Sequence, residues 1–279
     1  MSGFQFFHVE AYSIVASKDN KRQSARNIAA EADRFALACP HINNLKQPVR
    51  LYGCSANEVV DEAEKIFNTA TDKLGRKIRK DANILLAGVV SYPIPIENLR
   101  PDDERFKKWI KLNLKFFRKK YGKYFRSGIG HVDESYFHIH ISLLPEVDSK
   151  NILRFSTIHD GIRARESAAK LGAKAKVRAY TEAMRTLQDE YYENVGKPSG
   201  LTREGPKRRR LSRKEWVHEQ KTAERLARAE SRIEQIQNAA KKIRLQKAAL
   251  RKKTTSNIAI KHIEHQKETE LTNIYNNKR

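Results

Sequence analysis

Residues 136–143, YFHIHISL, constrain the fold of this chain more than any other stretch, because their polar and apolar side chains alternate. In a β-strand, successive side chains point to opposite faces of the sheet. One face of this strand is therefore apolar and suited to a core, with Phe137, Ile139, Ile141 and Leu143. The other face carries two imidazoles and a hydroxyl, from His138, His140 and Ser142. The stretch predicts a strand with one face against an apolar core and the other face toward a polar surface.

The surrounding sequence predicts further strands and helices in a mixed order. Residues 4–15 and 125–132 read as strands, and the continuous apolar run 82–94 suits a central strand that is covered on both faces. Helices are expected over 20–35, over 56–74 after a Ser55–Glu58 capping box, and from Pro101 to Gly122. The strands over 125–132 and 136–143 are expected to form an antiparallel pair. We therefore expect an α+β fold, in which helices pack on a sheet.

The character of the chain changes after about residue 150, where the sequence becomes helical and basic. We expect a folded domain over 1–200, a basic linker over 201–215 and a helical extension over 216–279. The extension has a heptad-like apolar series that Lys247 interrupts: Leu226, Ala229, Ile233, Ile236, Ala240, Ile243 and Leu250. This series predicts a helix or short coiled coil, which serves dimerisation or partner docking, or packs on the domain.

The formal net charge of +23 indicates a polyanionic partner. Nucleic acid is favoured over a membrane, because the longest apolar run, 84–90, is far shorter than the roughly 20 residues that span a bilayer. The N-terminus has no signal-peptide pattern. Cys39 and Cys54 form neither a CxxC pair nor a disulfide framework, so we expect a cytoplasmic protein.

Three of the nine histidines fall within residues 131–140. His138 and His140 share a strand face, and a hairpin would bring His131 beside them. Three neutral imidazoles can hold a catalytic metal and leave positions open for substrate and water. Asp133 and Glu134 lie in the turn, where either can orient a histidine or act as a general base. The alternative is that these histidines line a solvated sheet face or contact phosphates.

The segment HVDESYFHIHISLLP resembles the third motif of the Mob/Pre (MobV-type) plasmid mobilisation relaxases, with the pattern H-x-D-E-x-x-x-H-x-H. These are HUH-type single-strand DNA endonucleases. Three flanking segments also resemble the family, in the same order along the chain: RKIRKDANILLAGVV, FFRKKYGKYFRSGIGHVDE and YTEAMRTLQDEYYENVGKPSGLTREG. The resemblance covers residues 1 to about 210, and it implies an antiparallel HUH-type relaxase sheet with flanking helices.

The resemblance also implies a site and a reaction. His131, His138 and His140 would ligate a divalent cation, Mn²⁺ or Mg²⁺, which polarises the scissile phosphate. Glu134 matches the acidic position that assists the nucleophile. Such relaxases nick one strand of plasmid DNA at an origin of transfer, stay attached to its 5′ end and later rejoin it, by transesterification through a covalent protein–DNA intermediate.

The chain departs from the family at the nucleophile. The family's first motif, H-x-x-R, supplies a histidine, but the corresponding position before Arg34 is Glu31. Tyr12 is a second candidate, because other relaxases use an N-terminal tyrosine, and His41 is a third. For Tyr12 the alternative is a core or edge aromatic, and for Glu31 it is a solvated or salt-bridged helical carboxylate. The nucleophile stays open.

Basic residues outside the motif are candidate DNA contacts. The turn before the central strand carries Arg76, Lys77, Arg79 and Lys80, which we expect at the sheet rim near the histidines. Arg126 is close in sequence to the motif. Non-specific, salt-sensitive affinity is expected from the linker cations Lys207, Arg208, Arg209 and Arg210. The alternative is a solvated, charged turn and linker.

The first function hypothesis is a metal-dependent relaxase, an enzyme that nicks single-stranded DNA at a plasmid origin of transfer. Its further partners would be a second copy of the chain or relaxosome and coupling proteins, contacted through the C-terminal helix. The second hypothesis is a DNA-binding mobilisation or replication accessory that keeps the fold without strand transfer, which the missing histidine favours. A third, a rolling-circle replication initiator, shares the chemistry, but the mobilisation-type sequence around the motif argues against it.

Overall fold

The computed structural model describes residues 3–17 and 22–205, together with positions 218, 221–222, 225, 228–229, 232–233, 235–247 and 267. The chain divides into two compact units, Met1–Lys207 and Arg208–Arg279. The first unit is the α+β domain. The predictions for Lys207–Arg210, Leu226 and Leu250 fall outside the described residues. In the second unit the described residues of 218–247 are helical and exposed.

The domain is built on a five-stranded antiparallel sheet with the strand order β1-β3-β5-β4-β2. Its strands are β1 (Phe6–Ser13), β2 (Val49–Gly53), β3 (Asn83–Pro95), β4 (Phe125–His131) and β5 (Tyr136–Leu143). The strands expected over 4–15, 82–94, 125–132 and 136–143 are all confirmed, whereas β2 was not predicted. β2 is short, and its residues are partly or fully exposed, so its sequence carries little apolar pattern.

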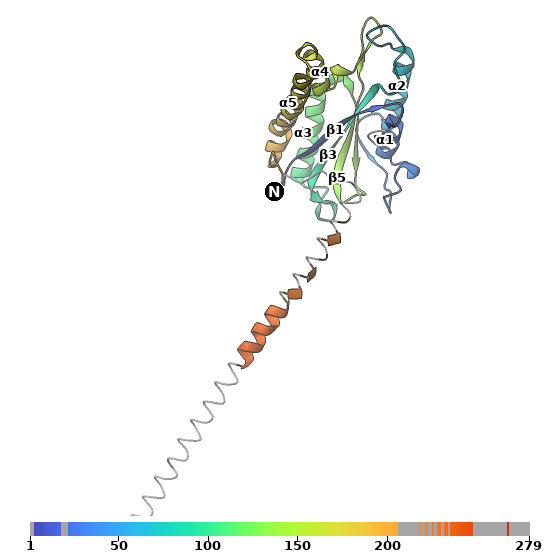
Figure 1. Cartoon of the computed structure of the whole chain (residues 1–279). Helices are drawn as coiled ribbons and strands as arrows, with labels where there is room; N and C mark the ends of the chain where they lie inside the picture. Colours follow the sequence, from blue (N-terminus) through green and yellow to red (C-terminus); the bar gives the residue numbers. More distant parts are fainter. Residues whose placement is uncertain are drawn as a thin grey trace, which may run out of the picture. The chain divides into compact units, whose positions relative to one another are not determined.

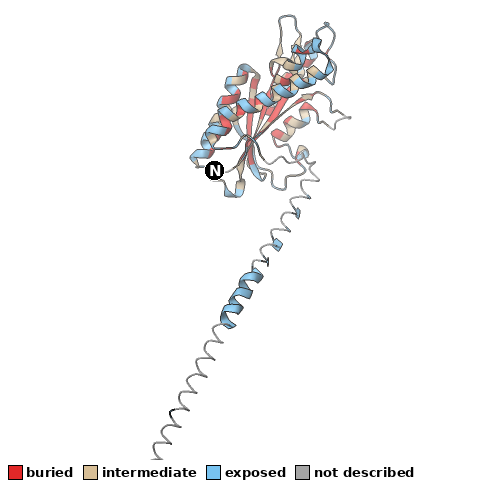
Figure 2. Ribbon diagram, turned by 60° about the vertical axis from the view of Figure 1, so that its left-hand side comes forward, coloured by how far each residue is buried: buried red, intermediate tan, exposed pale blue. Residues whose placement is uncertain are grey.

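Helices cover both faces of the sheet (Figure 1). On one face lie α1 (Ala25–Ala32) and α2 (Ala56–Thr69), and on the other lie α3 (Glu104–Tyr121) and α5 (Ala173–Tyr191). Each helical layer has its own apolar core against the sheet. Figure 2 shows the buried residues concentrated in the strands and on the helix faces that meet them. The prediction that β3 is covered on both faces is confirmed, since Leu85, Leu86 and Val90 are each at most 1% exposed.

Local signals fix the ends of these helices. At the start of α2, the Ser55 side chain accepts from the Glu58 backbone N–H, and the Glu58 carboxylate accepts from Ser55 N at 2.7 Å, which is the predicted capping box. The third helix ends at Gly122, whose φ of +52° is a conformation that favours glycine. Trp109 and Phe117, on the face of this helix that meets the sheet, are fully buried.

The helical prediction for residues 161–196 is confirmed as two helices instead of one. A short α4 (Asp160–Ser167) precedes α5, and Gly172, with φ +88°, separates them. A π-helical turn, Tyr192–Gly196, follows α5. The remaining elements are a two-stranded ribbon of β6 (Glu146–Val147) and β7 (Leu153–Arg154), and 3₁₀ turns at 36–38, 96–98, 122–124, 155–157, 169–171 and 197–199.

The two ends of the sheet differ in chemistry. At the end where β4 finishes and β5 begins, the three histidines of the motif lie together; we call this the histidine end. The basic turn before β3 lies at the opposite end. His138 of β5 pairs with Ser91, which is near the C-terminal end of β3, so the N-terminal end of β3 and the turn before it lie far from the histidines. Among the described residues, no helix is long and apolar enough to cross a membrane.

Candidate active site

The β4–β5 hairpin brings the three histidines together, as the sequence predicts. His131 pairs directly with His138 across the two strands, so both rings lie on the face that carries α1 and α2. The ring centroids of His131 and His140 are 4.5 Å apart, and those of His138 and His140 are 5.1 Å apart. One ligand atom from each ring can be chosen so that all lie within 4.8 Å of one another.

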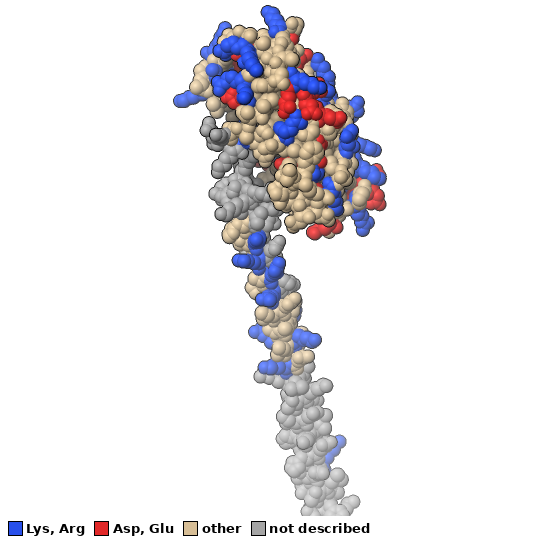
Figure 3. Space-filling view, turned by 90° about the vertical axis from the view of Figure 1, so that its right-hand side faces the viewer, with Lys and Arg blue, Asp and Glu red and all other residues tan. Residues whose placement is uncertain are grey.

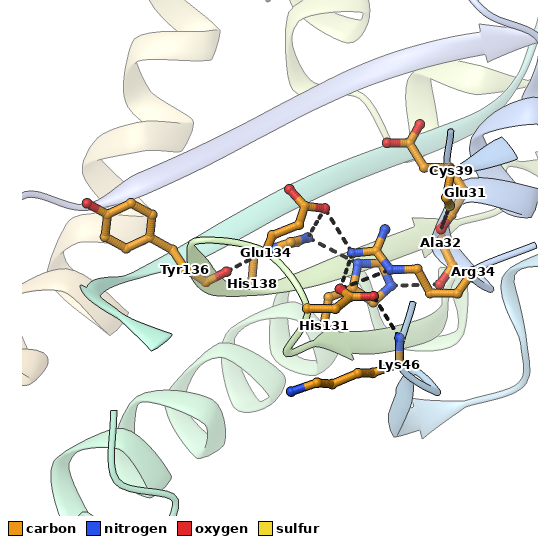
Figure 4. Close-up of polar contacts among 10 residues, drawn as sticks. Glu31, Ala32, Arg34, Cys39, Lys46, His131, Glu134, Tyr136 and His138 are labelled. Carbon is orange, nitrogen blue, oxygen red and sulfur yellow. Dashed lines mark hydrogen bonds and ion pairs between the residues drawn. The ribbon is translucent and has the colours of Figure 1, made fainter. Parts of the chain in front are cut away.

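Backbone carbonyls fix the proton positions on two of the rings (Figure 4). His131 Nε2 lies 2.7 Å from the carbonyl oxygen of Ala32, at the end of α1, and His138 Nδ1 lies 2.9 Å from that of Tyr136. A carbonyl oxygen can only accept a hydrogen bond, so each of these nitrogens carries the proton. The remaining nitrogens, His131 Nδ1 and His138 Nε2, therefore face each other 3.1 Å apart with their lone pairs.

Two facing lone pairs repel unless a cation lies between them. A proton on His131 does not supply this charge at neutral pH, because burial and the neighbouring His138 lower the pKa of His131 to about 4. Burial and the two neighbouring rings also lower the pKa of His140. His131 and His140 are therefore neutral imidazoles, the form in which histidine binds metal.

Arg34 holds the turn that follows the first histidine. Its Nη2 donates to Asp133 Oδ1 at 2.6 Å and to Glu134 Oε1 at 2.8 Å, and its Nε donates to the same Asp133 oxygen at 3.2 Å. The side chains of Arg34 and Asp133 are 2% and 1% exposed, so the pair is almost fully removed from water. Arg34 has a φ of +61°, an unusual value for a residue with a side chain. This backbone turn at the end of α1 aims the guanidinium at the hairpin.

The same contacts set the charge of the two turn carboxylates. Burial alone would raise the pKa of Asp133, but hydrogen bonds from Arg34 and from the Lys46 backbone N–H lower it overall. For Glu134, burial likewise opposes ionisation, and His138 together with Arg34 lowers the pKa below its usual value. Glu134 Oε1 lies 3.6 Å from His138 Nε2, and its side chain is 36% exposed. Glu134 is thus an ionised carboxylate that faces both the cluster and the solvent.

The candidate nucleophiles lie at different distances from the cluster. Glu31 is in the last turn of α1, next to Ala32, although its carboxylate points away from His131 in Figure 4. Tyr12 of β1 pairs with Leu85 of β3. It lies four residues along β1 from the cross-strand row that contains His140. Its hydroxyl donates to Glu10 at 3.3 Å. Burial and Glu10 raise its pKa, which disfavours the phenolate. His41 lies in the turn that follows the buried Cys39. Glu31 thus directly precedes Ala32, whose carbonyl contacts His131, but its carboxylate lies on the side of Tyr12, where it helps to raise the pKa of that hydroxyl.

The expectation that the basic turn before β3 lies near the histidines is wrong. The turn is held at the opposite end of the sheet by bridges of Thr71 to Lys77 and to Ile152. Two of its cations are in ion pairs, Arg76 with Asp72 and Arg79 with Asp81. The strand from Asn83 to Ser91 alone separates Lys80 from the histidine row by roughly 26 Å. DNA contact by Arg76, Lys77, Arg79 and Lys80 stays a prediction for that end of the sheet.

Arg126 also lies away from the histidine row. It is five residues before His131 on β4 and forms a bidentate pair with Glu62 of α2, at 2.9 and 2.6 Å. Its role as a DNA contact likewise stays a prediction.

Sequence reasoning missed Arg34 and the two carbonyls of Ala32 and Tyr136 as parts of the site. The pairing of Arg34 with Asp133 spans 99 residues, so no local pattern could show it. The arginine of the H-x-x-R motif was the one signal in the sequence, and it pointed only to the position of Glu31. Backbone carbonyls leave no trace in the sequence at all.

The sequence profile of the family Mob_Pre, described as plasmid recombination enzyme, matches residues 9–222. The chain belongs to this family. As a Mob_Pre protein of the MobV type, it is a plasmid mobilisation relaxase. Membership of this family supports the view that the protein is an enzyme that nicks DNA and transfers the strand. No curated protein matches the chain.

A solved structure of a Mob_Pre relaxase domain shares the fold. A crystal structure of the MobM relaxase domain (MOBV; Mob_Pre), Mn-bound and in complex with origin-of-transfer DNA of plasmid pMV158, is 14% identical and has a TM-score of 0.51. The match covers 77% of this chain and 99% of that one. A second MobM complex, also Mn-bound, is 13% identical over 77% of this chain and 98% of its own, with a TM-score of 0.49.

Proposed function

We propose that the protein nicks and rejoins one strand of plasmid DNA at an origin of transfer, with a divalent cation held by His131, His138 and His140. The observation that carries the proposal is the pair of facing lone pairs on His131 Nδ1 and His138 Nε2, 3.1 Å apart. Two nitrogen ligands at about 2.1 Å from one ion, at right angles to each other, lie about 3 Å apart. The donor set therefore fits a metal ion.

Mn²⁺ is our first choice of ion, since the MobM relaxase domain described above is Mn-bound, and Mg²⁺ is the alternative. When bound, the ion would neutralise negative charge that develops on the scissile phosphate. The carbonyls of Ala32 and Tyr136 orient the rings of His131 and His138 for this task. Hydrogen bonds to the ring nitrogens that do not bind the ion commonly have this role around metal-binding histidines. Glu134, ionised and partly exposed, is placed to accept the proton of a nucleophile.

Arg34 has one more donor to offer to the DNA. Its Nη1 is buried and has no hydrogen-bond partner among the described residues. A phosphate oxygen that enters beside Asp133 and Glu134 would satisfy this N–H and gain a charge-assisted bond. We infer that Arg34 both orders the hairpin turn and contacts the scissile phosphate.

The proposed reaction keeps the energy of the phosphodiester bond. An oxygen or nitrogen of the protein attacks the phosphorus, the 3′ oxygen leaves as a hydroxyl, and the 5′ phosphate stays on the protein. Attack by a 3′ hydroxyl reverses the step and rejoins the strand. Glu31 is our preferred nucleophile position because it directly precedes Ala32, whose carbonyl contacts His131, with Tyr12 and His41 as the alternatives.

The test combines nicking with metal binding. We expect supercoiled plasmid that carries the cognate origin to become nicked and protein-linked in the presence of Mn²⁺, and mass spectrometry of the linked peptide names the nucleophile. His138→Ala should lose Mn²⁺ binding in calorimetry and lose nicking, while the matched change His218→Ala, at an exposed helical position, keeps both.

Two other results would contradict the proposal. Retained nicking in folded His138→Ala would refute the ligand assignment. A gel shift without a nick at any Mn²⁺ or Mg²⁺ concentration would support the second candidate, a DNA-binding accessory protein. The specific observation in favour of that candidate is the glutamate at position 31.

A further inference from the structure

Exposed aromatic side chains gather at the histidine end. Within residues 3–17 and 22–205, the exposed aromatic side chains are Phe4, Phe6, Phe35 and Tyr136, at 46%, 47%, 55% and 44%. Every one of them lies at this end of the sheet. The other phenylalanines, tyrosines and the tryptophan of these ranges are buried or partly buried, many of them in the aromatic core around α3. Since aromatic surface is costly to leave in water, this clustering calls for a ligand.

Phe6 shares a cross-strand row with two of the histidines. It pairs with Ser91, Ser91 pairs with His138, and His138 pairs with His131. Directly paired residues point to the same face, so the ring of Phe6 lies on the face that carries the cluster. Two strand spacings separate it from His138, or about 10 Å. That distance corresponds to about three nucleotides of a stacked strand.

Tyr136 flanks the cluster on the strand that carries two of its rings. Its carbonyl oxygen contacts His138, while its ring points away from His131 and His138 (Figure 4) and is exposed. Phe35 flanks the cluster on the side opposite to Tyr136. It directly follows Arg34, which binds the turn at the end of β4. It lines a groove together with the side-chain amides of Gln23 and Asn27. Phe4 differs from these three, because its ring also packs against Gly205.

The side of the domain that bears α1 and α2 is not uniformly charged. In Figure 3, charged side chains gather over one part of this side, and a broad area carries neither acidic nor basic groups. An exposed aromatic ring does not attract a polyanion by charge. It does offer flat apolar partners to unpaired bases, since every base has a π-face.

We propose that Phe6, Phe35 and Tyr136 form a base-stacking surface, which holds single-stranded DNA on both sides of the phosphate at the histidine cluster. This inference rests on the proposed function, because the histidines and Arg34 must hold that phosphate. The surface binds unpaired bases with little sequence preference, and it excludes duplex DNA, whose bases are already stacked and paired. It thereby selects the single-stranded form of the substrate around the nick.

The experiment measures binding of the full chain to a 20-nucleotide oligothymidylate by fluorescence anisotropy, without divalent metal so that no strand is cut. Each of Phe6→Ala, Phe35→Ala and Tyr136→Ala should weaken binding about tenfold, within the range for loss of one stacked base. Tyr136→Phe and Phe6→Trp should bind like the natural protein, because stacking needs the ring alone. Leu74→Ala and Leu171→Ala, which remove even more exposed apolar side chains elsewhere, should have no effect.

Two further readouts separate stacking from other causes. The slope of log affinity against log salt should be unchanged in the alanine variants, because the protein still binds the same phosphates. The Mn²⁺ affinity of Phe6→Ala and Phe35→Ala should also be unchanged, which shows that the cluster is intact. With 2-aminopurine in the strand, fluorescence quenching should be lost in the variants.

The outcomes distinguish this inference from the proposed function. If the natural protein binds the oligothymidylate and all three alanine variants bind equally well, the stacking surface is refuted while the proposed function stands. If the natural protein binds only duplex DNA, both are refuted.

Discussion

At the scale of single residues, the site depends on Arg34, a side chain that comes from outside the motif. Arg34 is joined to Asp133 over 2.6 Å with both side chains almost fully buried. Loss of one member leaves the other charge buried without a partner, which is more costly than the pair is favourable. The turn between β4 and β5 therefore depends on a residue about a hundred positions away.

We expect Arg34→Met to lower the free energy of unfolding by about 3–5 kcal/mol, because it strands the Asp133 carboxylate. Urea unfolding followed by circular dichroism measures the change. The matched variant is Arg79→Met, whose pair with Asp81 is 80% and 60% exposed. Its effect should stay within about 1 kcal/mol. Equal effects of the two changes would contradict a structural role of Arg34.

Glu31 stands where the resemblance to the family's H-x-x-R motif leads us to expect a histidine. A carboxylate at this position repels the phosphate, whereas a neutral imidazole is both uncharged and nucleophilic. We expect Glu31→His, which restores the family's H-x-x-R pattern, to raise the rate of plasmid nicking with Mn²⁺ by at least about tenfold, a barrier change of about 1.4 kcal/mol.

The nicking rate is measured on supercoiled plasmid, with Glu31→Gln as the control that removes only the charge. A rate for Glu31→His at or below that of the natural protein would show that position 31 does not supply the nucleophile. Modification of Tyr12 or His41 in the linked peptide would then name the group that does.

At the scale of elements, sequence patterns identified those parts of the fold that depend on near neighbours. The alternation in β5, the capping box of α2 and the apolar run of β3 each act within a few residues, and each prediction is confirmed. The hairpin that unites the three histidines was predictable for the same reason. The place of the basic turn before β3 was not, because it depends on the direction of pairing between β3 and β5. The end of α1 beside His131 likewise depends on tertiary packing.

A buried hydrogen bond joins helix α5 to helix α3, and we expect it to contribute to the stability of the domain. Tyr191 donates its hydroxyl to Asn113 Oδ1 at 2.8 Å, and the amide of Asn113 donates to the Trp109 carbonyl. Tyr191→Phe should lower the free energy of unfolding by about 1–3 kcal/mol, because it leaves the buried Asn113 oxygen without a donor.

Thermal or urea unfolding measures this effect, and Tyr136→Phe is the control, since that tyrosine is 44% exposed. If Tyr191→Phe changes stability no more than Tyr136→Phe does, then apolar packing alone holds α5 on the sheet.

At the scale of the whole molecule, the basic charge is unevenly distributed along the chain. In residues 208–279, Lys and Arg outnumber Asp and Glu by more than two to one, although this part is about a quarter of the length. The domain with the histidines shares the rest of the net charge of +23 over a far longer stretch. We therefore expect non-specific affinity for DNA to come largely from the C-terminal part of the chain.

A combined change of Lys207, Arg208, Arg209 and Arg210 to Gln tests this division. For a single-stranded oligonucleotide, the slope of log affinity against log salt should decrease by about 0.7 for each phosphate that the variant no longer neutralises, so by up to about 3. The matched variant changes Arg76, Lys77, Arg79 and Lys80 to Gln, which removes the same charge from the far end of the sheet. It should alter the slope for a short oligonucleotide less. An unchanged slope in the first variant would refute DNA binding by the linker.

The closeness of the three histidines in sequence has a consequence for the order of folding. All of them lie on one hairpin, so the cluster forms through contacts of at most nine residues, and closing such a short loop costs little entropy. The Arg34 contact spans 99 residues and needs the whole sheet. We expect the hairpin to assemble early and Arg34 to dock late. A chain that is still incomplete in its tertiary structure would then already present the imidazoles to a cation, and the ion would act as a nucleus around which the last parts of the site are ordered.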